Sequence, residues 1–460
     1  MSESVQHPDK SGVEEHPSRE VQSSGTVTRY QSLALLGSSL LAAVSTLLVT
    51  MIAQRALNGS ELTEFLLFWA ALFTVTGIIT GIQPEITRAV GTARTRAVAD
   101  RAASGRTVSA EGSAPQGARV VTVATALGAI ASALVLVSSP LWAGHQIPHS
   151  AAVGVTVMAV GVFLYALQAT MSGVTAGEDR WYLFAAVGGL ESAGRLILML
   201  AAALMIPSLA GLEVATVVPM GLWLILAFVT VSGRRLWVAR ADVPARRLSL
   251  NILWSFLSSA AAAVLMMGFP NVLKASGAAE SEPVVLGTLI LAISITRSPI
   301  MIPLQAFQGV AVSAFLKQRH RPVAAFIKPA AAVVAVGAAG ALAAYLVGPL
   351  LFRLIYPPAA GAESAYEAAA SGITLGALVF ASALLALMTL SGNMALAVNQ
   401  HRIYLAGWVV AAAVTLSLAF LIPAPLVPRA IVALAVGPVC GFVVHMVGVS
   451  VTAPQRIILH

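Results

Sequence analysis

The sequence predicts an all-α polytopic membrane protein with about twelve transmembrane helices arranged in two six-helix lobes. Hydrophobic residues make up 58% of the 460-residue chain and charged residues only 10%, whereas a soluble domain carries roughly a quarter charged residues. Twelve apolar stretches reach the length of about 20 residues that a helix needs to cross the hydrocarbon core of a bilayer. Lysine and arginine gather in the loops on one side of these stretches. A water-soluble fold is therefore excluded.

The predicted spans form two groups of six, separated by a basic linker. Each span is expected to be helical, because every backbone N–H and C=O group inside a bilayer must be hydrogen-bonded within its own segment. The eighth stretch is longer than the others and contains Arg297, Pro299 and Pro303. The twelve spans comprise residues 32–53, 64–88, 119–140, 151–173, 182–205, 212–233, 250–270, 284–311, 329–352, 369–392, 403–422 and 430–451.

Most of the 27 lysines and arginines lie on one side of the predicted spans. That side holds the segment before the first span, the loops 94–119 and 234–247, and residues 317–328. Because positive residues concentrate in cytoplasmic loops, this side is predicted to face the cytoplasm. We therefore expect a multi-pass protein of the cell (plasma) membrane, with both termini in the cytoplasm and membrane lipids as partners. This topology accounts for the net charge of +8, so no nucleic-acid partner is expected.

Two six-span units with the same orientation are typical of parallel repeats related by an axis along the membrane normal. The first residues are polar, mix both charge signs and lack the apolar region of a signal peptide, so they are predicted to be a disordered cytoplasmic tail. The predicted organisation is a tail at 1–30, an N-terminal lobe at 31–233, a basic linker at 234–249, a C-terminal lobe at 250–452 and a cytoplasmic tail at 453–460.

Features that would indicate an enzyme or a metalloprotein are absent from the sequence. Cys440 is the only cysteine, and the histidines are dispersed, so no metal site is predicted. The cytoplasmic loops contain no glycine-rich phosphate-binding motif. We therefore expect no catalytic residue, no metal ligand and no cofactor. The acids predicted on the outer side are scattered over several loops and form no paired motif: Glu61, Glu64, Glu213, Glu280, Glu282, Glu363 and Glu367.

The most informative charged residue within a predicted span is Arg297. Charged side chains within the membrane cost about 2.5 to 3.5 kcal/mol on insertion scales, so they suggest a functional site. Pro299 and Pro303 are expected to kink the same span and to free backbone carbonyls. A guanidinium facing a cavity there suits a phosphate or diphosphate, because it offers paired donors. The alternative is an arginine that pairs with a carbonyl or reaches the interface.

Three further charged residues are candidates for substrate or ion binding. Glu191 and Arg195 lie four residues apart in the fifth span and can pair on one helix face. Arg195 is thus a second candidate for an anionic headgroup and Glu191 for a coupling ion, with a structural ion pair as the alternative. Glu85 follows Pro84 near the cytoplasmic end of the second span. It is a candidate proton or cation site, or a partner of Arg88 at the interface.

Two stretches resemble the polysaccharide exporters of the multidrug, oligosaccharidyl-lipid and polysaccharide (MOP) superfamily. Residues 52–65, IAQRALNGSELTEF, followed by an apolar run to Gly77, Gly81 and Arg88, are similar to that family's first helical hairpin. Residues 177–181, GEDRW, are similar to the short charged loop that precedes its fifth span. The twelve-span layout also matches.

This resemblance implies a flippase-like transporter in which two lobes surround a cavity lined chiefly by spans one, two, seven and eight. It implies that a lipid-linked oligosaccharide or polysaccharide precursor moves from the inner to the outer leaflet for cell-envelope polysaccharide biosynthesis. Arg297 and Glu85 lie on two of the lining spans and are favoured over Arg195. The implied partners are the lipid-linked saccharide and the glycosyltransferases or polymerase of the same pathway.

The sequence leaves three alternatives open. A cation-coupled multidrug exporter of the same fold would need cavity carboxylates, for which Glu85 and Glu191 are available. A membrane glycosyltransferase would need acids that converge at an outer loop. A scaffold for envelope polysaccharide synthesis would use the N-terminal tail and the loop 94–119 as docking elements.

Overall fold

The computed structural model describes residues 28–104, 117–277, 283–317, 322–358, 363–398 and 400–452. The predicted tails, 1–30 and 453–460, lie almost wholly outside these ranges. Within the described residues, twelve helices or helix groups are long and apolar enough to cross a membrane, and the segments contain no β-strand. The predicted all-α class and the twelve spans are confirmed.

The N-terminal lobe contains the first six spans, and α2 continues beyond the apolar region as α3. Asn58 caps α2 with its side chain, which accepts from the Glu61 N–H, and the Glu61 carboxylate faces the Asn58 N–H in return. The elements are α1 Arg29–Ala56, α2 Gly59–Ile79, α3 Ile82–Ser104, α4 Val120–Gln146, α5 Ala151–Gly177, α6 Trp181–Met205, α7 Leu209–Val217, the 3-10 turn Val218–Gly221 and α8 Trp223–Val229.

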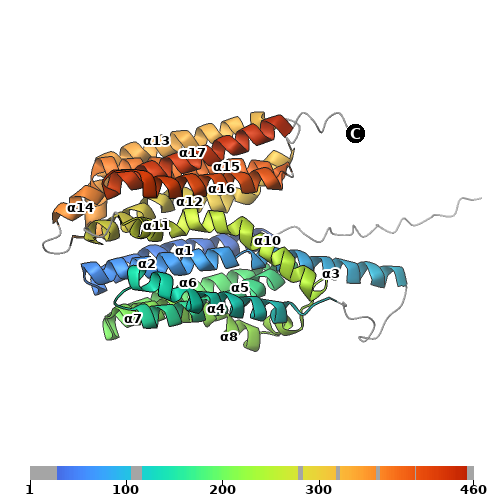
Figure 1. Cartoon of the computed structure of the whole chain (residues 1–460). Helices are drawn as coiled ribbons and strands as arrows, with labels where there is room; N and C mark the ends of the chain where they lie inside the picture. The colour runs from blue at the N-terminus through green and yellow to red at the C-terminus, as the bar shows by residue number, and fades with distance from the viewer. Residues whose placement is uncertain are drawn as a thin grey trace, which may run out of the picture.

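The C-terminal lobe contains the other six spans. Its first span is interrupted by a π-helical turn, Val264–Gly268, and α12 runs on beyond its apolar part. Figure 1 shows α13, α15, α16 and α17 in one layer, the N-terminal lobe in another, and α10, α11 and α12 between them. The elements are α10 Ala245–Ala263, α11 Phe269–Ala275, α12 Pro283–Lys317, α13 Pro322–Ile355, α14 Glu363–Ala370, α15 Gly372–Ala397, α16 His401–Leu421 and α17 Leu426–Thr452.

We call the end of the bundle with Arg119 and Asp242 the basic end. The linker between the lobes is held there against the N-terminal lobe. Arg88 of α3 donates to the Asp242 carboxylate at 3.2 Å, and Arg96 lies 3.7 Å from it. The linker also forms an isolated β-bridge between Arg119 and Arg240. The linker, which follows the helical turn α9 Val231–Arg234 and begins with the 3-10 turn Arg235–Val238, is therefore docked on the N-terminal lobe.

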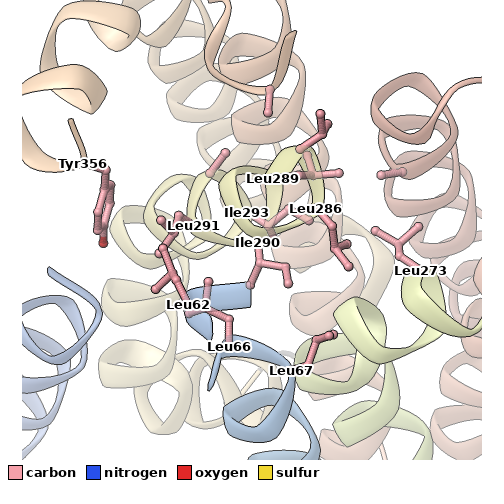
Figure 2. Close-up of a cluster of buried hydrophobic side chains, with 14 of the residues drawn as sticks. Leu62, Leu66, Leu67, Leu273, Leu286, Leu289, Ile290, Leu291, Ile293 and Tyr356 are labelled. Atoms are coloured by element: carbon pink, nitrogen blue, oxygen red, sulfur yellow. The ribbon is translucent and has the colours of Figure 1, made fainter. Parts of the chain in front are cut away.

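We call the opposite end, with Asn58 and Tyr356, the far end. The two lobes pack together in that half of the bundle through leucine and isoleucine side chains of α2, α11 and α12 (Figure 2). The buried residues of this contact include Leu62, Leu66, Leu67, Leu273, Leu286, Leu289, Ile290, Leu291 and Ile293. Because these side chains come from both lobes, separating the lobes at the far end would expose apolar surface.

Polar contacts complete the far-end contact between the lobes. The hydroxyl groups of Thr50 in α1 and Tyr356 after α13 lie 2.7 Å apart, and Gln54 donates to the Pro357 carbonyl. Burial raises the pKa of Tyr356, and burial likewise raises the pKa of Tyr366 to about 12. Both hydroxyl groups therefore keep their protons at physiological pH, and that of Tyr356 forms the hydrogen bond with Thr50.

Helix α10 contacts both lobes. It begins after Pro244, five residues before the predicted span, because a proline readily precedes the first helical turn. Its basic-end half packs on α2 and α3, where a Cβ at Gly81 would lie 2.9 Å from the Ser255 carbonyl. The Asn251 amide donates to Glu85 at 2.8 Å. Only glycine allows this close approach between α2 and α10.

The predicted orientation can be tested with single cysteines in a Cys440→Ser background. Glu363 is exposed at the far end and Val98 is exposed on α3 at the basic end. If the basic end faces the cytoplasm, the Glu363→Cys protein should react with a membrane-impermeant maleimide in intact cells. The Val98→Cys protein should react only after the cells are permeabilised. The reverse pattern would contradict the orientation.

Candidate functional site

Arg297 lies inside the C-terminal lobe in this structure. Its Nη1 donates to the carbonyl of Met266, which belongs to the π turn of the seventh span. Such a turn interrupts the regular helical hydrogen-bond pattern. The guanidinium borders a cavity of about 10 Å³ with Thr296, Ser382 and Pro438, which is room for roughly one water molecule. Nε of Arg297 has no hydrogen-bond partner among the described residues.

Glu191 and Arg195 form an ion pair inside the N-terminal lobe, as their spacing predicts. The Gln168 amide of α5 donates to Glu191, and Nε of Arg195 donates to the Thr216 carbonyl of α7 at 3.5 Å. Both charged side chains are largely buried. The pair therefore connects α5, α6 and α7 through hydrogen bonds.

Two aromatic rings of α2 extend this network. The Arg195 guanidinium lies 5.1 Å from the ring centre of Phe73 and 5.8 Å from that of Trp69. A guanidinium at these distances is attracted to the negative face of an aromatic ring, and the attraction strengthens in a desolvated site. Arg195 is thus surrounded by an opposite charge, a carbonyl and two rings. This arrangement favours a structural role for the pair.

Glu85 lies at the basic end, in the first turn of α3. Arg88 donates to both of its carboxylate oxygens, at 2.6 and 2.9 Å, and Asn251 of α10 donates to one of them. Arg88 also binds Asp242 of the linker. Glu85 therefore joins the N-terminal lobe to the first helix of the C-terminal lobe. The structure thus places the four predicted site residues in three separate locations.

A large apolar groove lies between the lobes and has a volume of about 660 Å³. The N-terminal lobe supplies α2 and α4, and the other wall is formed by α10, the π turn and α11. At the far end, the Gln146 amide donates to the Asn271 carbonyl at 3.1 Å. Much of the lining is aliphatic or aromatic, as in Val75, Ile78, Ala131, Leu134, Leu253 and Phe256.

The structure also brings together two acids that were predicted at scattered outer positions. Glu64 of α2 and Glu213 of α7 both contact the Ser150 hydroxyl. Their exposed fractions are 4% and 0%. A saccharide substrate cannot reach carboxyl groups that are buried in this way, so the pair does not form the open acid site of a glycosyltransferase. The sequence feature that could have indicated this pair is the presence of one glutamate in each of two apolar stretches.

Comparison with known proteins identifies relatives along nearly the whole chain, although no family model matches. The chain is 31% identical over 420 residues to the uncharacterized protein Rv1510 of Mycobacterium tuberculosis, covering 91% of each chain. It is 32% identical over 434 residues to Rv3630 of the same organism, covering 93% of this chain and 94% of that protein. The chain belongs to this family of mycobacterial proteins.

Solved structures with the same fold are transporters of the MOP superfamily. An inward-facing multidrug transporter of the MATE family has a TM-score of 0.68 at 13% identity, covering 91% of this chain and 98% of that chain. The lipid II flippase MurJ, in an inward closed conformation, has a TM-score of 0.65 at 9% identity, covering 92% and 88%. The fold implied by the first hairpin is confirmed, and these fold neighbours are transporters rather than enzymes.

The structural role of Arg195 can be tested by substitution. Arg195→Met should lower the free energy of unfolding by about 3 to 5 kcal/mol, because Glu191 would remain buried without its partner. Arg94→Met is a matched control: Arg94 pairs with Asp179 at 2.8 Å with both side chains partly exposed, and such pairs contribute less than about 1 kcal/mol. Denaturant unfolding of the purified proteins measures the change in the free energy of unfolding for both variants. Equal effects would contradict a structural role for Arg195.

Proposed function

We propose that the protein is a membrane transporter that moves an anionic lipid-linked saccharide from the inner to the outer leaflet by alternating access. The observation that supports this best is the apolar groove between the lobes. With a volume of about 660 Å³, it can accept part of a prenyl or acyl chain. Such a chain leaves water when it enters the groove, which is favourable by about 0.8 kcal/mol per buried methylene group.

The position of the groove agrees with a transport cycle. One wall belongs to the N-terminal lobe and the other to the first span of the C-terminal lobe, so movement of the lobes would change its width. The lobes contact each other through the far-end leucine cluster, which would have to separate before a headgroup could leave there. The fold neighbour MurJ is a lipid II flippase, which supports a lipid-linked substrate for this chain too.

Arg297 is the preferred residue for the anionic headgroup. Its guanidinium has a donor, Nε, that no described residue uses, next to a small cavity. Arg195 is less suited, because Glu191 and Thr216 already engage it. A diphosphate would bind the free donor capacity of Arg297 once the π turn or α12 rearranges. The glycosyltransferases and polymerase that make and use such a saccharide would be the pathway partners.

A cation-coupled multidrug exporter is the second candidate, favoured by the TM-score of 0.68 to a MATE transporter. A cationic drug would require carboxylates in the binding cavity. The described residues that line the groove include no acid, and Glu85 and Glu191 are each paired with an arginine. Transport of cationic dyes, with no movement of lipid-linked saccharides, would favour this candidate.

Filling the groove tests the proposed lipid path. Ala131→Trp places a large side chain in the groove and should reduce the initial rate of flipping about tenfold, equivalent to about 1.4 kcal/mol. Val137→Trp is the matched control, because Val137 lies on the same helix, is 78% exposed and is not part of the groove lining. The assay follows a fluorescent prenyl-diphosphate-linked sugar in proteoliposomes. Equal rates for the two variants would exclude the groove as the lipid path.

Substitution of Arg297 tests the proposed headgroup site. Arg297→Ala should nearly abolish flipping of the diphosphate-linked sugar in the same assay, because the bound anion would lose its charged donor. Arg297→Lys keeps the charge but loses the paired donors, so it should retain a small part of the activity. Thermal unfolding of both variants reports any loss of folded protein. Unchanged flipping by folded Arg297→Ala protein would overturn the headgroup site.

A further inference from the structure

A cluster of titratable groups lies at the far end of the N-terminal lobe, apart from the groove and from Arg297. It consists of Glu64 on α2, Glu213 on α7, and His149 and Ser150 in the turn between α4 and α5. The two carboxyl groups are buried, whereas the His149 side chain is 69% exposed. The cluster therefore links a buried acid to the solution at the far end.

Glu64 has the contacts of an ionised carboxylate. Its Oε1 accepts the backbone N–H groups of His149 and Ser150, each at 2.8 Å. Its Oε2 lies 2.7 Å from Nδ1 of His149. These groups also lie at the N-terminus of α5, where the helix dipole stabilises negative charge. Hydrogen bonds from N–H donors favour the charged form of a carboxyl group.

The Ser150 hydroxyl contacts both carboxyl groups, at 3.1 Å from Oε1 of Glu64 and 2.7 Å from Oε1 of Glu213. A hydroxyl has one proton and can donate to only one of two acceptors. Both contacts are hydrogen bonds only if one carboxyl group is protonated and donates to the serine oxygen. Ser150 precedes α5 but makes no side-chain capping bond to it, so its hydroxyl is committed to the two acids.

Glu213 is the acid that fits the protonated form. Its exposed fraction is 0%, and its Oε2 has no hydrogen-bond partner among the described residues. An ionised carboxylate that is buried without donors is strongly destabilised. Gly154 makes room for the group, since a Cβ there would lie 3.1 Å from Oε1 of Glu213.

The charged groups on the helices around α7 do not neutralise Glu213. Helix α2 contributes Glu64, whose negative charge would repel an ionised Glu213. Helix α6 contributes Arg195 and Glu191, which pair with each other, and Arg195 also donates to the carbonyl of Thr216 on α7. The turn before α5 contributes His149, which faces Glu64. A proton is thus the cation best placed to compensate Glu213.

We infer that Glu213 is a buried proton-binding site connected to the solution at the far end through Ser150, Glu64 and His149. To release its proton, Glu213 donates to the serine oxygen while Ser150 passes its own hydroxyl proton to Glu64. The protonated Glu64 carboxyl group then rotates so that its new O–H faces His149 in the Nε2–H tautomer of the ring. Nδ1 of His149 accepts this proton, and Nε2 of the exposed ring releases its own proton to water. Each step breaks one O–H or N–H bond and forms another. This site does not depend on the nature of the transported substrate.

Infrared spectroscopy of the purified full-length protein in nanodiscs tests the protonation of Glu213. At neutral pH the spectrum should contain the carbonyl stretching band of a protonated carboxylic acid. Glu213→Gln should remove this band, and Glu363→Gln, which changes an exposed acid on α14, should retain it. Absence of the band from the unaltered protein, or its persistence in Glu213→Gln, overturns the proposal.

Two further variants test the connections of the site. Ser150→Ala removes the hydroxyl that contacts Glu213 and should shift the frequency of the band, which keeps the test available if Glu213→Gln does not fold. An unshifted band overturns the hydrogen bond between them. His149→Ala should slow the exchange of the band in deuterated water, because the exposed proton carrier is lost. An unchanged exchange rate overturns the route through His149.

Discussion

Charged side chains in the interior of this helical bundle are compensated by ion pairs and hydrogen bonds, because an isolated charge in a low-dielectric interior is strongly unfavourable. The Glu191 and Arg195 pair illustrates this constraint, since it is in contact with α2, α5, α6 and α7. Arg297 meets the same requirement through a backbone carbonyl of the π turn. These buried charges therefore join α6 to α2, α5 and α7 in the N-terminal lobe, and α12 to the π turn in the C-terminal lobe.

Helix α10 has a different role, because it contacts both lobes at different depths. At the basic end Asn251 binds Glu85, and Ser255 packs against Gly81. Further along, the π turn and α11 form one wall of the groove and approach α2. The linker that leads into α10 is also held by Arg88 and Arg96. Movement of one lobe relative to the other must therefore bend or displace this span, and the π turn is a natural place for bending.

The sequence allowed the prediction of the parts of the fold that depend on local composition. Span number and position followed from apolar length, and the pairing of Glu191 with Arg195 followed from helical spacing. The second span was predicted to end at residue 88, whereas the helix continues to Ser104, because charged residues end an apolar run without ending a helix. The direction in which the Arg297 side chain points depends on the π turn, whose carbonyl it binds. No sequence pattern predicted this turn.

Contacts between distant segments could not be predicted from the sequence. Glu64 and Glu213, which both contact Ser150, are 149 residues apart in the sequence. No periodic pattern connects them. The groove depends on how α10 crosses between the lobes, which is a property of tertiary packing. Sequence composition could indicate an apolar interior but could not locate a groove within it.

The length of the second transmembrane element has a mechanical consequence. Together α2 and α3 span residues Gly59–Asp100, or 42 residues, which at about 1.5 Å per residue is roughly 60 Å, twice the thickness of the hydrocarbon core. One end bears Glu64 of the proton site, and the other bears Arg88 and Arg96, which hold the linker. The turn at Thr80 and Gly81 divides this element near its middle. If α2 and α3 tilt together, the linker and Glu64 move in opposite directions, and the basic end is then mechanically coupled to the far end.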